Sequence, residues 1–341
     1  MALKEALGRA INGHDLSAEQ AEAAMGVIMR GEGTPAQIGA YLVALRMKGE
    51  SAAEIAGSAR AMRAHVVAVP VAHGPGQPLL DTCGTGGDGK ATFNISTTAA
   101  FVVAAAGLRV AKHGNRAASS QSGSADVLLA LGANLELTAD QVAECIRDLG
   151  IGFLYAVNHH PAMRHAIGPR RELGQRTIFN LLGPLTNPAG ASHQLLGVYA
   201  PDWVETLAQV LASLGSQAAL VVHGADGLDE LSTTGPNLVC QLRAGRLTAF
   251  ELDPRDLGLA RASLADLQGG TPGENAAISR AILAGADTGP RRDIVLLNAA
   301  AAITLVGVEW QAALEQARQA VEGGAALGKL DAWIEKSHSF T

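Results

Sequence analysis

The chain has few cysteines, few aromatic residues and no long apolar run. Its three cysteines, Cys83, Cys145 and Cys240, lie far apart without a CxxC pair, which argues against a disulfide scaffold and a cysteine zinc site. Aromatic residues are only 4% of the chain, so aliphatic residues must build the core. No segment offers the roughly 20 apolar residues that a membrane helix needs, and the N-terminus has no apolar signal core. We expect a cytoplasmic protein with reduced thiols and no membrane partner.

Acidic residues are missing from one segment although the whole chain is acidic. Asp and Glu total 32 against 26 Lys and Arg, a formal net charge of −6, yet residues 89–125 contain no acid. The overall balance disfavours a nucleic-acid partner. An acid-free segment in an acidic chain has the composition of a site for a small anion, such as a phosphate group.

Residues 1–70 predict a set of helices. Ser17, Thr34 and Ser51 each stand three residues before a Gln or Glu, which is the spacing of a capping box. Pro35 takes the favoured first position of a helix. Because a few short helices bury little surface alone, this unit needs a partner surface. A linker rich in Pro and Gly follows at residues 69–78.

Short apolar runs alternate with alanine-rich stretches after the linker. This alternation predicts an α/β fold with a mostly parallel sheet flanked by helices. The expected strands are 79–80, 109–111, 151–155, 194–199 and 218–222, and the expected helices are 96–106, 122–131, 139–149 and 203–214. Residues 238–240 and 247–250 predict a hairpin, and the chain beyond it returns to helices.

The glycine-rich segment after the first predicted strand fits two nucleotide-binding motifs only in part. Residues 84–89 match GxGxxG, but the acid that a dinucleotide site needs about 20 residues later is absent. Ala91 follows Lys90 where a Walker A loop carries a magnesium-binding Ser or Thr. The sequence therefore disfavours both a dinucleotide site and an ATPase.

What remains of this segment suits a phosphate. Its glycines let backbone N–H groups face an anion, and Asn94, Ser96 and Thr97 stand where the next helix begins, with its partial positive charge. Lys112 and Arg116 follow the end of another strand, and the carboxyl ends of parallel strands share one edge of a sheet. We expect two phosphate-sized groups to bind at this edge.

Asp229 and Glu230 follow a later predicted strand at the same edge. Two carboxylates are hard oxygen ligands of the kind that Mg²⁺ prefers. Composition alone favours a solvated pair of loop acids, and Asp226 nearby has the same chemistry. The residues by themselves leave this choice open.

Several motifs, in order along essentially the whole chain, resemble the anthranilate phosphoribosyltransferase family. They are residues 84–88 (GTGGD), 94–97 (NIST), 112–116 (KHGNR), 122–126 (SGSAD), 160–163 (HPAM), 176–180 (RTIFN), 183–188 (GPLTNP) and 229–230 (DE). The resemblance implies transfer of the 5-phosphoribosyl group from phosphoribosyl pyrophosphate to the amine of anthranilate, with release of pyrophosphate, in tryptophan biosynthesis. It also implies Mg²⁺ as cofactor and a homodimer formed through the helical domain.

The family fold is a small all-helical domain hinged to a larger α/β domain with a central mixed, mostly parallel sheet. The resemblance places residues 1–70 and about 166–190 in the helical domain, and residues 71–165 and about 191–341 in the large domain. Only the resemblance indicates that the second segment returns to the helical domain.

The resemblance also implies the roles of individual residues. For anthranilate these are Gly84, Asn115 and Arg170, and for magnesium Ser96, Asp229 and Glu230, which reverses the interpretation of the two acids as solvated. For phosphoribosyl pyrophosphate they are Gly84, Gly87, Asp88, Thr92, Asn94, Ile95, Ser96, Thr97, Lys112, His113, Gly114, Asn115, Arg116, Ala117, Ala118, Ser119, Ser120 and Ser124.

Arg170 suits the anthranilate carboxylate because a guanidinium can make a two-pronged contact that Lys cannot. Arg171 is next to it, so the assignment depends on one residue of register, and a solvated helix start is the alternative interpretation of the pair. No residue is assigned as a general acid or base, since the anthranilate amine is a neutral nucleophile near pH 7. His113 is expected to be a structural strut. His159 and His160, on an extended segment, would point to opposite sides and bind no metal.

Two other functions stay open at this stage. One is a pyrimidine nucleoside phosphorylase-like enzyme, or another enzyme of the same fold with a different acceptor; phosphorylases of this fold carry Lys-x-Ser-Thr-Gly-Gly where this chain has Cys-Gly-Thr-Gly-Gly at residues 83–87. The other is a catalytically silent homologue that binds nucleic acid, which the acidic net charge and the intact Asp229, Glu230 and Arg170 disfavour.

Overall fold

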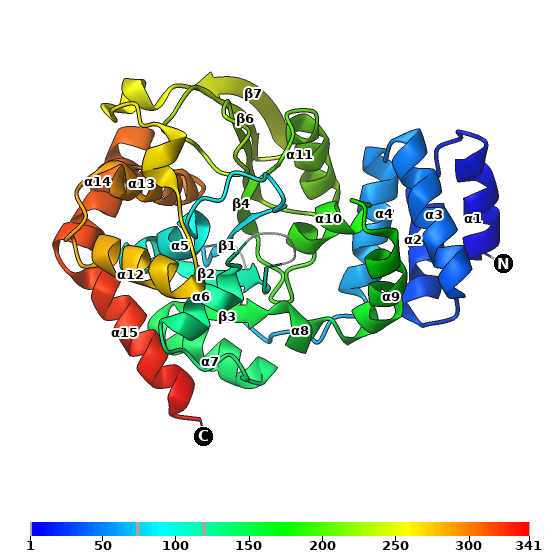
Figure 1. Cartoon of the computed structure of the whole chain (residues 1–341), viewed down its shortest axis with the longest axis horizontal. Helices are drawn as coiled ribbons and strands as arrows, with labels where there is room; N and C mark the ends of the chain where they lie inside the picture. Colours follow the sequence, from blue (N-terminus) through cyan, green and yellow to red (C-terminus); the bar gives the residue numbers. More distant parts are fainter. Residues whose placement is uncertain (1, 73–75, 118–120, 341) are drawn as a thin grey trace.

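The computed structural model describes residues 2–72, 76–117 and 121–340. Figure 1 shows two parts beside each other, a group of helices that carries the N-terminus and a larger part built around a sheet that carries the C-terminus. None of the helices in these ranges is long and apolar enough to cross a membrane.

The N-terminal part consists of four helices, α1 (Ala2–Ile11), α2 (Ala18–Met29), α3 (Pro35–Lys48) and α4 (Ala52–Arg63). The three predicted capping boxes are confirmed. The side chains of Ser17, Thr34 and Ser51 each accept the backbone N–H three residues on, and the side chain of that later residue accepts the backbone N–H of the cap. The predicted position of Pro35 at the start of α3 is also confirmed. These caps fix where three of the four helices begin.

A segment from the middle of the chain packs on these helices. It contains α9 (Arg164–Leu173), which contacts α2 and α3, and α10 (Phe179–Leu182), which contacts α4. Ala166, Phe179 and Leu182 are buried in the same apolar cluster as the side chains of α1–α4. Figure 1 shows α9 and α10 next to these helices. The helical unit therefore gains part of its core from residues far along the sequence.

The larger part contains a seven-stranded mixed sheet, in the order β3-β2-β1-β4-β5-β6-β7 among the described residues. The first five strands in this order pair in parallel, and β6 and β7 are antiparallel, so the predicted mixed, mostly parallel sheet is confirmed. The strands are β1 (Leu79–Gly84), β2 (Arg109–Gly114), β3 (Ile151–Tyr155), β4 (His193–Gly197), β5 (Ala218–Gly224), β6 (Asn237–Arg243) and β7 (Arg246–Leu252).

Strands β1 and β2 are longer than their apolar residues predict. Asp81, Thr82 and Lys112 continue the two strands and are buried, at 0%, 0% and 4% exposure. A buried polar side chain is tolerated when it is hydrogen-bonded. Here the Asp81 carboxylate accepts the backbone N–H of His113, 3.1 Å away, so this hydrogen bond joins the polar ends of β1 and β2.

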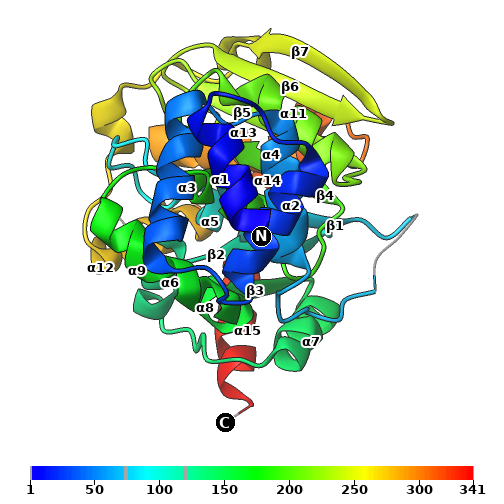
Figure 2. The same cartoon turned by 90° about the vertical axis from the view of Figure 1, so that its right-hand side faces the viewer.

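Helices cover both faces of the sheet. The remaining α-helices in the described residues are α5 (Ile95–Ala105), α6 (Ser124–Ala130), α7 (Ala139–Leu149), α8 (Ala156–His159), α11 (Trp203–Ser213), α12 (Pro272–Leu283), α13 (Pro290–Thr304), α14 (Trp310–Glu322) and α15 (Ala325–His338). Alternate residues of a strand point to opposite faces: Leu195 and Leu220 join a core with α5 and α13, whereas Leu196 and Val221 join the core shared with α11 and the helical unit. Figure 2 shows this helical unit in front of the sheet.

The strand order reverses at β1, because β2 and β3 lie on one side of it and β4 and β5 on the other. In parallel α/β sheets, ligands bind outside the carboxyl ends of the strands at such a reversal. A ligand site is therefore expected at the loops that follow Gly84, Gly114 and Gly224, where β1, β2 and β5 end.

Candidate active site

The glycine-rich segment connects the end of β1 to the start of α5. Gly86, Gly87 and Gly89 have φ angles of 69°, 78° and 72°, a left-handed conformation that glycine adopts without strain. Ala91 shares this conformation, with φ 56°. The loop thus presents backbone with little side-chain cover, which allows an anion to approach closely.

The start of α5 contributes further polar groups. Asn94 is the N-cap residue and makes no side-chain capping bond, while Ser96 and Thr97 lie in the first turn. The side chain of Ile95 is 1% exposed and packs in the core, so only its backbone can face a ligand. Thr92 pairs with Gln268 through an isolated β-bridge. The helix N-terminus adds partial positive charge at this point.

Lys112, at the end of β2, brings a full positive charge beneath this helix start. Its ammonium donates to the carbonyl oxygen of Thr82 and lies 3.5 Å from Oγ of Ser96. The neighbouring loop is fixed by Ser124, whose Oγ accepts the N–H of Asn115 at 3.1 Å and donates to the Asn115 carbonyl oxygen at 3.2 Å. A Cβ at Gly114 would lie 2.1 Å from that Oγ, so this position requires glycine.

Arg116 and Ala117 are ordered by Asp126. The Asp126 carboxylate accepts the N–H of Ala117 at 2.9 Å and lies 3.6 Å from a nitrogen of the Arg116 guanidinium. Arg116 also donates to the Tyr155 hydroxyl at 3.0 Å. The expected donor positions Ala118, Ser119 and Ser120 lie outside the described residues.

Asp229 and Glu230 meet the glycine-rich segment directly. The Asp229 carboxylate accepts the N–H of Gly86 at 2.6 Å, and the Glu230 carboxylate accepts the N–H of Ser96 at 3.1 Å. A Cβ at Gly84 would lie 2.3 Å from the Asp229 carboxylate. The structure therefore brings the two acids, the phosphate-type loop and the start of α5 to one edge of the sheet.

The two carboxylates are held in a site that favours their neutralisation. Burial, followed by the charges of Asp88 and Glu230, raises the pKa of Asp229 well above its usual range. Burial raises the pKa of Glu230 to about 7, although the charge of Lys112 acts in the opposite direction. Closely spaced acids that are partly removed from water repel each other when ionised, and a cation between them would remove that repulsion.

Magnesium fits this donor set. The available atoms are carboxylate and hydroxyl oxygens, the ligands that Mg²⁺ prefers. Within the described residues no group of three or more His, Cys, Asp or Glu is placed to hold a metal alone. Mg²⁺ is commonly held by one or two carboxylates together with substrate phosphates and water, and the pair Asp229 and Glu230 fits that pattern.

Asp226, which has the same chemistry, serves the loop instead. Its carboxylate accepts the hydroxyls of Ser232 and Thr234, both at 2.6 Å, and the N–H of Leu228 at 3.1 Å. These bonds occupy the side chain in holding the loop that carries Asp229 and Glu230.

Arg170 and Arg171 lie in the last turn of α9, so the interpretation of this pair as a helix start is wrong. The Arg170 guanidinium is half-buried and lies 5.0 Å from the centre of the Phe179 ring. Burial lowers the pKa of Arg170, and no salt bridge to it occurs among the described residues. Arg171 is exposed. The two neighbouring arginines therefore differ, because Arg170 is partly removed from water and packs against an aromatic ring, whereas Arg171 is exposed.

The predicted extended segment at His159 and His160 is a helix end instead, because α8 finishes at His159. Nδ1 of His159 lies 3.1 Å from the carbonyl oxygen of Val67, whereas Nε2 of His160 lies 3.1 Å from Nε2 of His113. Burial is the first cause that lowers the pKa of His113 well below its usual value and that of His160 to about 4. Both rings are thus neutral near pH 7, and one donates to the other.

Two residues that sequence reasoning did not single out also hold the site. The Arg176 guanidinium donates to the carbonyl oxygen of Gly87 and lies 4.2 Å from the centre of the Tyr199 ring. The Asn187 amide donates to the Asp81 carboxylate at 2.8 Å. Both residues belong to motifs on which the family resemblance depends, and that resemblance is the signal that could have indicated them. Their bonding partners lie 89 and 106 positions away in the sequence, so local patterns do not reveal the contacts.

Comparison with known proteins first defines the class. Residues 4–66 match the helical bundle domain of the glycosyl transferase family, and residues 76–327 match the a/b domain of that family. An anion site beside a carboxylate pair is consistent with enzymes that act on phosphorylated sugars.

Individual relatives make the assignment narrower. The anthranilate phosphoribosyltransferase of Moorella thermoacetica is 54% identical over 98% of both chains. The crystal structure of the Thermus thermophilus anthranilate phosphoribosyltransferase is 47% identical with a TM-score of 0.92, covering 97% of this chain and 99% of that one. The Saccharomyces cerevisiae enzyme in complex with PRPP and Mg is 30% identical with a TM-score of 0.90, covering 99% and 98%; a 4-fluoroanthranilate complex of the yeast enzyme also matches. The chain belongs to the anthranilate phosphoribosyltransferase family.

Proposed function

We propose that this chain transfers the 5-phosphoribosyl group from phosphoribosyl pyrophosphate to the amine of anthranilate, giving N-(5-phosphoribosyl)anthranilate and pyrophosphate in tryptophan biosynthesis. The observation that carries the proposal is the meeting of the glycine-rich loop and the start of α5 with Asp229 and Glu230 at one edge of the sheet. The names of the relatives, and the PRPP, Mg and 4-fluoroanthranilate complexes of the yeast enzyme, support it.

The donor binds through the glycine-rich loop and the acid-free segment that follows it. The glycine-rich loop and the start of α5 receive phosphate oxygens, and the buried Lys112 ammonium adds charge below them. Asp88 and Asn115 stand on the two loops that border this position. The other residues that contact the donor are those that the family resemblance implies.

Mg²⁺ would be held by Asp229 and Glu230 with the Ser96 hydroxyl nearby. When bound, it neutralises charge on the departing pyrophosphate. The chain's own contribution is to fix both carboxylates beside the phosphate loop before the reaction begins.

The acceptor binds with its carboxylate on Arg170. Its ring would then lie between the helical unit and the sheet edge, with its amine turned toward the sugar carbon that loses pyrophosphate. The N–C bond forms as the C–O bond to pyrophosphate breaks, and the amine nitrogen then gives up a proton to water. Since the amine is already neutral near pH 7, positioning dominates over general-base help.

A fluorescence assay tests the function. The protein is mixed with phosphoribosyl pyrophosphate, Mg²⁺ and anthranilate, and the loss of anthranilate fluorescence is followed. We expect loss that needs all three components. Absence of loss at micromolar substrates, or phosphorolysis of uridine in its place, would overturn the proposal.

The proposal extends to organisation and location. We assign residues 1–70 and about 166–190 to a helical domain and the rest to the large domain, with substrate capture coupled to a hinge between them. Exposed Ile11 and Met47 on the helical unit support a homodimer through that domain, which light scattering can measure. The three free cysteines support a cytoplasmic location, testable by cell fractionation.

A further inference from the structure

A buried amide in α13 is bonded to the loop that carries the two acids. Asn298 is 0% exposed. Its Nδ2 donates to the carbonyl oxygen of Leu231 at 2.8 Å, and its Oδ1 accepts the N–H of the same residue at 3.0 Å. A third bond, to the Ile294 carbonyl oxygen at 2.9 Å, stays within the helix. One side chain thus holds both backbone groups of the residue next to Glu230.

The stability of α13 does not account for this asparagine. The helix is otherwise rich in Ile, Val, Leu and Ala and is buried along most of its length. An amide in such a place is costly unless it is fully bonded, and an apolar residue of the same size would satisfy the packing. Two of the three bonds of Asn298 reach across 67 positions to the backbone of Leu231.

The other side of the acidic pair is held just as closely. A Cβ at Gly197, the last residue of β4, would lie 1.6 Å from the carbonyl oxygen of Asp229. The backbone of Asp229 therefore rests directly on the strand end. The backbone is thus held at Asp229 by this contact and at Leu231 by the Asn298 bonds, with Glu230 between them.

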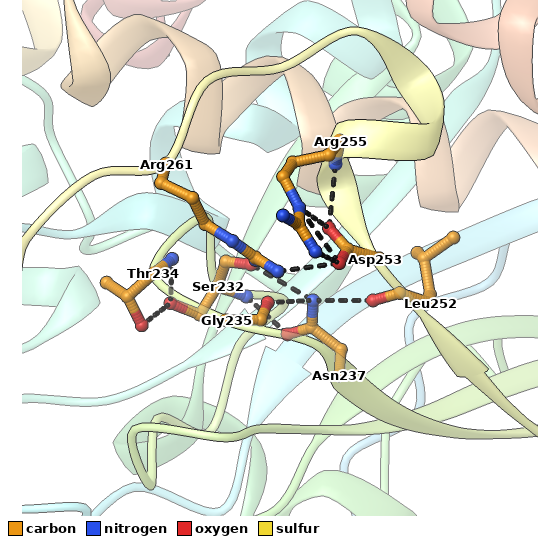
Figure 3. Close-up of polar contacts among 8 residues, drawn as sticks. All are labelled: Ser232, Thr234, Gly235, Asn237, Leu252, Asp253, Arg255 and Arg261. Carbon is orange, nitrogen blue, oxygen red and sulfur yellow. Dashed lines mark hydrogen bonds and ion pairs between the residues drawn. The ribbon is translucent and has the colours of Figure 1, made fainter.

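A second buried amide closes the turn that follows. Asn237 accepts the N–H of Ser232 at 2.7 Å and donates to the carbonyl oxygens of Ser232 and Leu252 at 3.0 and 3.2 Å. Figure 3 shows Asn237 between these two residues, with Asp253 paired to Arg255 and Arg261 nearby. Asn237 thus fixes the turn beyond Leu231, whereas Asn298 acts directly beside the acids.

We propose that Asn298 is a positioning residue for the magnesium-binding carboxylates. It fixes the backbone of Leu231 and thereby the positions from which the Asp229 and Glu230 side chains extend. Because the amide is neutral, it adds no charge beside two acids that repel each other. Residues that orient metal ligands from behind typically change metal affinity or activity by about 10- to 100-fold when removed. The inference rests on the proposed function.

The test replaces Asn298 and measures metal binding apart from turnover. Asn298→Leu keeps the approximate size of the side chain and removes both hydrogen bonds to Leu231. Asn298→Ala introduces a residue common in this helix and is the second variant to use if the leucine variant does not fold. Thr304→Ala is the matched control, because the Thr304 hydroxyl is buried in the same helix and donates only to the Ala301 carbonyl oxygen, 2.7 Å away. The probe is Mn²⁺ binding with phosphoribosyl pyrophosphate present and anthranilate absent, followed by electron paramagnetic resonance.

We expect Asn298→Leu to weaken Mn²⁺ binding at least about tenfold and to raise the Mg²⁺ concentration for half-maximal turnover equally, with the KM for anthranilate within twofold. Asn298→Ala should act in the same direction, and Thr304→Ala should change neither quantity. Unchanged Mn²⁺ binding in the folded Asn298 variants would overturn the inference, as would an equal loss toward anthranilate. The unaltered protein is assayed alongside, so failure of the proposed function itself would be seen separately.

Discussion

Replacing Arg170 by alanine should weaken the use of anthranilate far more than the use of the donor. The Arg170 guanidinium is half-buried over Phe179 and has no salt bridge among the described residues. A cation partly removed from water without a counter-ion gains strongly from an anionic ligand. Arg171, exposed one position later, is the matched control.

The size of the effect follows from the bonds that are lost. A hydrogen bond to a charged group contributes about 1.5–3 kcal/mol, and a two-pronged contact has two of them. Because water partly reaches Arg170, we take about 3 kcal/mol in total, which is roughly a 100-fold fall in kcat/KM for anthranilate at about 1.4 kcal/mol per factor of ten. Arg170→Lys keeps the charge but loses the planar fork, so its loss should be intermediate.

The assay is the decay of anthranilate fluorescence at saturating phosphoribosyl pyrophosphate and Mg²⁺, repeated with the donor varied. The KM for the donor should change by less than about threefold, and Arg171→Ala should behave like the unaltered protein. Equal losses toward both substrates, or a loss in Arg171→Ala as large as in Arg170→Ala, would refute the assignment of Arg170 to the acceptor.

Three further changes test other parts of the molecule. Gly84→Ala places a Cβ 2.3 Å from the Asp229 carboxylate, so the Mg²⁺ concentration for half-maximal turnover should rise about tenfold; an unchanged requirement contradicts the contact. Thr34→Ala removes the N-cap of α3 and should lower the free energy of unfolding by about 1 kcal/mol, measured with urea, while kcat stays the same. Burial, followed by the charge of His159, lowers the pKa of His160 to about 4, so the unfolded chain binds more protons between pH 6.5 and 4 and stability falls as the pH falls. Between pH 7 and pH 5 the protonation of this residue should lower the free energy of unfolding by about 2 kcal/mol. If the unfolding free energy of a His160→Gln variant changes with pH as steeply as that of the unaltered protein, His160 is not the cause.

Local sequence signals predicted the elements whose cause is local. The capping boxes at Ser17, Thr34 and Ser51 are each completed within four residues, so the sequence contains both partners of every bond. The bounds of β3 and α7 agree with the prediction because apolar periodicity, Thr138 as N-cap and Gly150 as C-cap define them. The hairpin of β6 and β7 is confirmed for the same reason, with Ala244 and Gly245 at its turn.

Features that depend on distant partners were not visible in this way. The polar ends of β1 and β2 were predicted as loop, because Asp81 is stable in a buried strand only with Asn187 and the backbone of His113 beside it. Asn298 stands in a stretch that composition describes only as an alanine-rich helix, and its partner Leu231 is 67 positions away. The sequence places the acids at the phosphate-binding edge only because they follow a predicted strand of the parallel sheet, and it gives no sign of the contacts that hold them there.

The origin of the charges in the site links donor binding to metal binding. The groups that attract phosphate lie in the glycine-rich loop and in the acid-free segment that follows it, while both acids come from a loop 134 to 143 positions further along the chain. In this structure the N–H groups of Gly86 and Ser96 donate to Asp229 and Glu230. A phosphate oxygen that takes either N–H must displace a carboxylate, and the displaced carboxylate is then free to bind a cation that the phosphate also binds. Under the proposed function, donor and Mg²⁺ would therefore compete with the same two contacts, and binding of one would favour binding of the other.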